Sequence, residues 1–231
     1  MKGLITEPTL VIEGKHKDAR GGVPNRLKLM VLSNYDWVVP AGADERRYCV
    51  IDVPGDRAQD QGYFGKLNAW LDADGARIFL HYLLNRDLSG FNPRVAPRTA
   101  ALDAQKIAAM SAVDRWLLEA LDTGILPRYH LPAAEWSEAG VELRCDEAVG
   151  SLAERGVRLR SRAAGKDARE IGKRLQQVFG CGPAAARAGQ QPAERDTPRP
   201  TWRAWSLPGL TEARARAAKA FGLTYYAWGQ A

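Results

Sequence analysis

An asparagine at the end of an apolar run, and two arginines one loop further on, are the residues best suited to phosphate chemistry. Asn34 follows the run Leu27–Leu32 closely. Its amide can bond a phosphate oxygen and a water, and the ends of inner strands are where open α/β sheets place such groups. Arg46 and Arg47 follow, and a guanidinium stays charged and binds phosphate oxygens in pairs. The alternatives are an asparagine that merely begins a turn and an arginine pair bonded to nearby surface carboxylates.

A second basic group lies earlier, between two predicted strands. Lys15, His16 and Lys17 stand in a glycine-containing connector, and Arg20 follows them. This composition predicts a mobile hairpin tip. Cations on such a tip can contact the phosphates of single-stranded DNA without reading its bases. An exposed polar hairpin with no ligand is the alternative.

A third basic group lies on a predicted helix at 167–179. An apolar stripe forms one side of this helix, made by Ile171, Leu175, Val178 and Phe179. Arg169, Lys173 and Arg174 lie largely on the remaining surface. A helix with this division suits the groove of duplex DNA, although a solvated face with no ligand has the same composition.

The charge of the chain is concentrated near its C-terminus. Residues 145–231 hold 15 Lys and Arg and 8 Asp and Glu, which gives this segment a net charge of +7. The whole chain carries +6, so the rest of the chain is slightly acidic. This basic excess favours a polyanionic partner, nucleic acid first and an anionic membrane surface second. The alternative is a solvated basic face with no partner.

Composition excludes several classes of protein. No apolar run is long enough for a transmembrane helix, and the first residues do not form a signal peptide. Three widely spaced cysteines and three scattered histidines give no metal-ligand spacing, so no metal site is expected. We therefore expect a protein of the cytoplasm with reduced thiols.

Apolar periodicity predicts an α/β domain followed by a smaller, mainly helical one. Strands are expected at 9–13, 27–32 and 48–53. Helices are expected near 63–71, 78–83 and 99–122, the last ending at Gly124. Beyond Gly124 we expect helices near 146–155, 167–179 and 211–221, a loose linker at 180–192 and a short strand at 201–207. The predicted domains are residues 1–122 and 123–231.

Several segments of the first domain together resemble a known family. They are Ile5–Pro8, Ile12–Lys17, Val23–Pro40, Asp44–Tyr48, Tyr63–Phe64 and Leu83–Asn92. In this order they resemble the C-terminal part of the helicase domain of phage and mobile-element primase–helicase proteins, which is a superfamily 3, AAA+-type helicase domain. The resemblance covers roughly residues 4–122. The remainder is similar to the DNA-binding tail, of winged-helix type, that often follows this domain.

The resemblance implies a role for each basic or amide group. Asn34 would be the sensor-1 residue, and Arg46 or Arg47 the arginine finger that reaches the nucleotide of a neighbouring subunit in a hexameric ring. Lys15, His16 and Lys17 would form the DNA-contacting hairpin. The protein would then act in DNA replication in a bacterial host, encoded by a phage or prophage.

One part of that family's machinery is missing from this sequence. No G-x-x-x-x-G-K-[ST] phosphate loop occurs in the 231 residues. We therefore expect no binding of ATP and Mg²⁺ by this chain alone, although both are implied for the complete helicase. The chain would be half of a split motor whose partner carries the phosphate loop, a fragment of a longer chain, or a prophage remnant. The competing hypothesis is a stand-alone DNA-binding protein that acts through its basic C-terminal domain.

Overall fold

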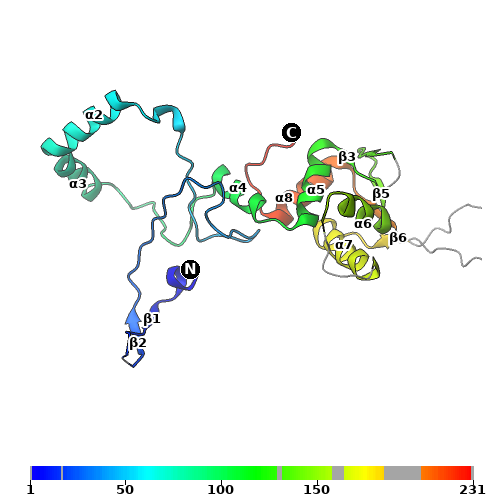
Figure 1. Ribbon diagram of the computed structural model, residues 1–231, viewed down its shortest axis with the longest axis horizontal. Coiled ribbons are helices and arrows are strands. Elements are labelled where there is room, and N and C mark those ends of the chain that lie inside the picture. The colour runs from blue at the N-terminus through cyan, green and yellow to red at the C-terminus, as the bar shows by residue number, and fades with distance from the viewer. Residues whose placement is uncertain (1, 17, 129–131, 158–163, 185–203, 230–231) are drawn as a thin grey trace, which may run out of the picture. The chain divides into compact units, whose positions relative to one another are not determined.

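Helices with a regular apolar period and short antiparallel strands make this a mixed α/β protein, as the sequence predicts. The computed structural model (Figure 1) describes residues 2–16, 18–128, 132–157, 164–184 and 204–229. The chain divides into two units. The N-terminal unit comprises residues 1–30 and 46–101, and the C-terminal unit residues 31–45 and 102–231. The predicted boundary at 122/123 differs from this division, since residues 31–45 and 102–122 pack within the C-terminal unit.

The N-terminal unit contains a hairpin and two longer helices. Strands β1 (Thr9–Ile12) and β2 (Arg20–Pro24) pair antiparallel, with Leu10 opposite Val23. The helices, with shorter helical elements beside them, are α1 (Lys2–Thr6), a 3₁₀ turn (Gly55–Arg57), α2 (Gln61–Trp70), a π-helical turn (Leu71–Gly75) and α3 (Ala76–Leu84). The carboxylate of Asp60 caps α2 by accepting the Tyr63 N–H at 2.9 Å. The helices predicted near 63–71 and 78–83 are confirmed.

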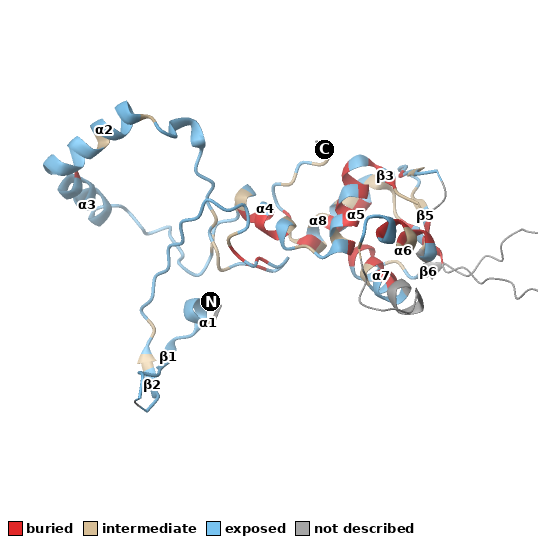
Figure 2. Cartoon of the chain, viewed as in Figure 1, coloured by how far each residue is buried: buried red, intermediate tan, exposed pale blue. Residues whose placement is uncertain are grey.

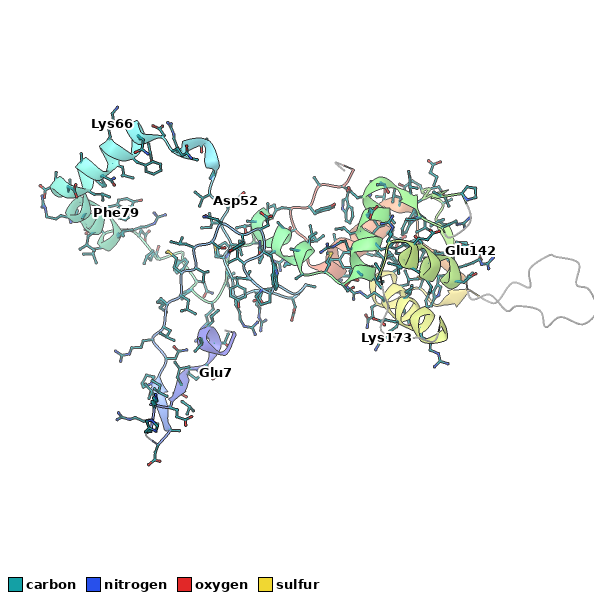
Figure 3. All side chains as sticks on the ribbon, viewed as in Figure 1. Glu7, Asp52, Lys66, Phe79, Glu142 and Lys173 are labelled. Carbon is teal, nitrogen blue, oxygen red and sulfur yellow. The ribbon has the colours of Figure 1, made fainter. Side chains whose placement is uncertain are left out.

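Burial is nearly absent from the N-terminal unit. Among its described residues only Gly75 is buried, and Figure 2 shows almost the whole unit as exposed. The apolar side chains of α3 are exposed as well, including Phe79 at 52% (labelled in Figure 3) and Leu84 at 76%. The periodic apolar residues of these helices therefore have no covering layer within the described part of the unit.

The strands predicted at 27–32 and 48–53 are wrong. Neither segment has strand structure, and Met30 and Leu32 are each 88% exposed. A strand that is apolar on both faces is stable only inside a sheet that is covered on both sides. The described residues supply neither flanking strands nor covering helices for these two segments.

The long helix predicted at 99–122 is divided in two. Helix α4 spans Ala100–Ala108 and α5 spans Ala112–Thr123. Ser111 caps α5, because its hydroxyl oxygen accepts the Asp114 N–H at 3.1 Å. Gly124 ends α5 in the left-handed region, with φ of 67°, so the predicted stop is confirmed.

The rest of the C-terminal unit alternates short strands with helices. A two-stranded sheet pairs β3 (Ile125–Leu126) with β4 (Ala134–Glu135). A three-stranded antiparallel sheet has the order β5-β7-β6, formed by Val141–Arg144, Ala204–Leu207 and Pro183–Ala184. The helices are α6 (Cys145–Glu154), α7 (Ala164–Phe179) and α8 (Leu210–Phe221). The helices predicted near 146–155, 167–179 and 211–221 are confirmed.

The C-terminal unit has one apolar core. Its members come from α5, α6, α7, α8 and the strands between them, and Figure 2 shows them as buried. The largest fully buried side chains include Trp116 of α5, Trp136, and Phe179 of α7. The rings of Trp136 and Phe179 meet edge to face, with centroids 5.8 Å apart. This core is what holds the helices of the unit in place.

We predict that the substitution Leu175→Ala strongly destabilises the C-terminal unit. Leu175 is fully buried on α7, and its truncation leaves a cavity that costs about 2–5 kcal/mol of unfolding free energy. The measurement is denaturant unfolding followed by tryptophan fluorescence. Leu84→Ala is the control, because the exposed Leu84 should change stability by less than about 0.5 kcal/mol. Equal effects of the two substitutions would show that burial of Leu175 does not stabilise the unit.

Candidate nucleic-acid interface

Helix α7 is buried in the core along one face only. Its predicted apolar stripe is buried, with Ile171, Leu175 and Phe179 at 0% exposure and Val178 at 5%. Gly172 lies against β7, where an added Cβ would come within 2.7 Å of the Trp205 ring. Helix α7 therefore packs closely on the sheet, and at position 172 there is space only for a glycine.

The opposite side of α7 is polar and exposed. Arg169, Lys173, Gln176 and Gln177 are all exposed, and the acidic Glu170 is exposed beside them. Among the described residues neither Arg169 nor Lys173 forms an ion pair. Lys173, labelled in Figure 3, lies at the outer surface of the C-terminal unit. Two cations and two amides therefore share one accessible helical face.

Arg174 lies differently from the other two predicted contact residues of α7. Its Nε donates to Asp114 Oδ1 of α5, and its guanidinium lies 5.5 Å from the centre of the Phe221 ring. The side chains of Arg174 and Asp114 are only 29% and 14% exposed. Arg174 thus belongs to the contacts between helices rather than to the exposed face.

Other arginines of the C-terminal unit are paired with carboxylates. Arg144 bonds Asp146 at 2.6 Å and Arg155 bonds Glu119 at 2.5 Å. Arg216 bonds Glu212 at 2.5 Å. Paired guanidinium groups contribute less to a surface field than unpaired ones, so these three arginines add less to the positive surface of the unit than Arg169 and Lys173 do.

Two titratable groups near these helices are neutral at physiological pH. Burial raises the pKa of the Cys181 thiol, just after α7. Burial, and secondarily the Asp122 carboxylate, raises the pKa of the Tyr226 hydroxyl. Because both groups lose a proton only above neutral pH, neither adds negative charge to the unit.

The basic connector lies at the turn of a hairpin, as predicted, although the second strand is β2 and not the predicted segment 27–32. Lys15 and His16 are exposed at the turn between β1 and β2, and His16 has a φ of 61°. Arg20 begins β2 and is also exposed. Lys17 lies outside the described residues.

The predicted phosphate-chemistry residues fall in different units. Asn34 is exposed on an irregular stretch that belongs to the C-terminal unit, and the segment 27–32 directly before it is not a strand. Arg46 is exposed and Arg47 half-buried in the N-terminal unit. The described structure therefore defines no shared site for these three side chains, and their catalytic roles stay predictions.

A buried polar cluster on α4 was not predicted from the sequence. Gln105 Oε1 accepts the N–H groups of Val38 and Val39 at 2.7 and 3.2 Å, and its Nε2 donates to the Asp36 carbonyl at 2.6 Å. This one side chain anchors the stretch that follows Asn34. Polar residues in a predicted helix are assigned to its solvent face, so periodicity gave no signal for this contact.

The same cluster holds the chain after α8. Asp103 Oδ2 accepts the N–H groups of Thr224 and Tyr225 at 2.6 and 2.7 Å. Lys106 Nζ donates to the Gly222 carbonyl at 2.5 Å and lies 3.8 Å from Asp103 Oδ1. Both charged side chains are 5% exposed, so their hydrogen bonds compensate for lost hydration.

Comparisons with known proteins do not extend this description. No protein-family model, no curated protein and no solved structure matches the chain. In the part of the chain that the structure describes, no three His, Cys, Asp or Glu side chains are grouped as metal ligands. Within the described ranges every helix is too short or too polar to span a lipid bilayer.

We predict that Gln105→Ala releases the stretch around Val38 from α4. The substitution leaves two N–H groups and a carbonyl without their partner, which costs about 1–3 kcal/mol where these groups stay buried. Hydrogen exchange of the Val38 and Val39 amides should accelerate markedly. Gln176→Ala, at an exposed position of α7, is the control, and unchanged exchange in the Gln105 variant would show that this contact is unimportant.

Proposed function

We propose that the C-terminal unit binds duplex DNA through the exposed face of α7. The observation that carries this proposal is the accessible pair Arg169 and Lys173, with Gln176 and Gln177, on a helix whose other side is locked into the core. Arginine and lysine bind phosphates, and glutamine amides can also contact base edges in the major groove.

The order of elements supports the same proposal. Apart from the two-stranded sheet of β3 and β4, which comes between α5 and β5, the chain runs α5, β5, α6, α7, β6, β7, α8, and β7 lies in the middle of its three-stranded sheet. This is the order of a winged-helix domain, in which the second helix of a helix-turn-helix enters the major groove. In such a domain α7 would take that second position.

The distribution of charge favours a polyanion as the partner. Residues 145–231 carry the excess of +7, and neutralising phosphates releases counterions from the duplex. The connection between β6 and β7, residues 185–203, lies outside the described residues and contains four arginines. Their charge would add to the attraction for a polyanion.

We predict that Lys173→Met weakens binding to duplex DNA and lowers its salt dependence. Loss of one phosphate contact should reduce the slope of log K against log salt concentration by about 1. The measurement is a fluorescence-anisotropy titration of the full chain at several salt concentrations. Lys219→Met makes the same charge change at an exposed position of α8 and should leave the slope as in the wild type. Equal effects at both positions would indicate only a general charge effect.

A second function, part of a replicative helicase, is proposed for the N-terminal unit. The specific observation is that this unit buries only Gly75 among its described residues, while the large apolar residues of α2 and α3 are exposed. Ordering a chain costs conformational entropy that apolar burial must offset. A unit of this kind needs another surface, and the resemblance suggests a partner that carries the phosphate loop.

Within such a complex the predicted residues would have distinct tasks. Asn34 would orient the attacking water, and Arg46 or Arg47 would stabilise the charge that develops on the transferred phosphoryl group. Lys15, His16 and Arg20 would contact single-stranded DNA at the hairpin. ATP and Mg²⁺ would be held by the partner. Without it, the chain would act only as a DNA-binding protein.

We predict that the purified chain alone does not hydrolyse ATP, and that its N-terminal unit is cut first in limited proteolysis. Residues 46–101 should be cleaved early because their backbone is exposed, while a fragment containing α5–α8 persists. Peptide mapping and a phosphate-release assay with Mg²⁺ and single-stranded DNA make the two measurements. Robust hydrolysis by the chain alone would refute the need for a partner, and resistance of residues 46–101 to protease would refute the missing cover.

A further inference from the structure

The contact between Arg174 and Asp114 joins α7 to the helix that begins the core. Arg174 lies at the edge of the buried stripe, between Ile171 and Leu175 in the same helix. Its Nε donates to Asp114 Oδ1, and its guanidinium covers the ring of Phe221 from α8. One side chain therefore links three helices.

Asp114 is a firm anchor for this contact. It lies in the first turn of α5, where its own N–H is held by the hydroxyl of Ser111 at 3.1 Å. The positive end of a helix dipole favours a carboxylate at this place. Its side chain is 14% exposed, so solvent screens the ion pair less than it screens a pair at the surface.

Arg174 also reaches the exposed face of α7. Its Nη1 donates to Gln177 Oε1 at 3.3 Å, and Gln177 is one of the exposed amides of that face. The same guanidinium thus contacts an internal anchor on one side and a surface side chain on the other. The end of α7 is held separately, where Arg216 donates to the Phe179 carbonyl.

We propose that the Arg174–Asp114 pair is a positioning device that sets the orientation of the DNA-binding face of α7. The inference rests on the proposed duplex-DNA binding by that helix. Arg174 acts through α7 and Gln177, not by touching DNA, and Asp114 acts through Arg174. A small rotation of α7 about its axis would move Arg169 and Lys173 out of register with the phosphates, since such contacts need accurate placement.

This role makes a prediction opposite in sign to simple electrostatics. Replacing Asp114 with a neutral residue makes the chain more positive, which alone should tighten binding to a polyanion. Loss of positioning should weaken binding instead. Because Asp114 is a carboxylate on α5, its substitution removes no cation from the exposed face of α7.

The experiment compares full-length variants by anisotropy titration with duplex DNA at several salt concentrations. Asp114→Ala should bind about tenfold more weakly, with a salt slope like that of the wild type. Asp114→Asn keeps the side-chain volume and should give a smaller loss in the same direction. Glu119→Ala is the matched control, because Glu119 lies on the same helix and its ion pair with Arg155 is exposed; it should bind as the wild type or more tightly.

Thermal unfolding of each variant separates positioning from loss of fold. The titrations are made at a temperature where both Asp114 variants are fully folded, so a lower affinity reports the bound geometry. If folded Asp114→Asn binds as tightly as Glu119→Ala, the proposal is overturned. It is also overturned if Arg174→Met lowers the salt slope as Lys173→Met does, since Arg174 would then contact phosphate directly. If the wild type binds no duplex DNA, the proposed function fails and this inference with it. If Lys173→Met weakens binding and the Asp114 variants do not, only this inference fails.

Discussion

Burial of one continuous apolar cluster determines how helices α5 to α8 are arranged in the C-terminal unit. Helices α5, α6, α7 and α8 each contribute side chains that are almost completely buried, including Trp116, Leu152, Phe179 and Ala217. Because an interior of this kind is closely packed, large rotations of each helix about its axis are excluded. The polar face of α7 is exposed because its apolar face has no other place to lie.

The two halves of the chain differ in how much apolar surface they cover. The sequence has similar apolar periodicity in α3 and in α5, yet Val113 and Leu117 are buried and Phe79 and Leu83 are exposed. Periodicity shows which side of a helix is apolar, and it does not show what covers that side. The described residues of the N-terminal unit therefore have local structure without a buried interior, and for this reason a covering partner is proposed for that unit and not for α7.

Elements that depend on contacts between neighbouring residues were predicted well from the sequence, and those that depend on residues far apart in the sequence were not. Helices with caps and stops, such as α5 between Ser111 and Gly124, depend on neighbouring residues and were predicted closely, apart from the break before Ser111. Strands at 27–32 and 48–53 depend on distant partners and did not form. The same reason explains the candidate site: the exposed cations of α7 could be predicted from helical spacing, whereas the inward contact of Arg174 with Asp114 joins residues 60 positions apart. The polar cluster of α4 joins still more distant segments, and its side chains looked like ordinary surface residues.

The anchoring of Asp36–Val39 on α4 has a consequence for residues 46–101. The chain leaves the C-terminal unit after Glu45 and returns to it at Leu102. Gln105 of α4 bonds the backbone of Asp36 and Val38, so the segment before residues 46–101 is tied to the helix after them. The excursion is therefore a loop closed at its base. The entropy of closing a loop rises only with the logarithm of its length, by about 0.6 kcal/mol for each doubling. Insertions and deletions within residues 46–101 should consequently change the stability of the C-terminal unit only slightly.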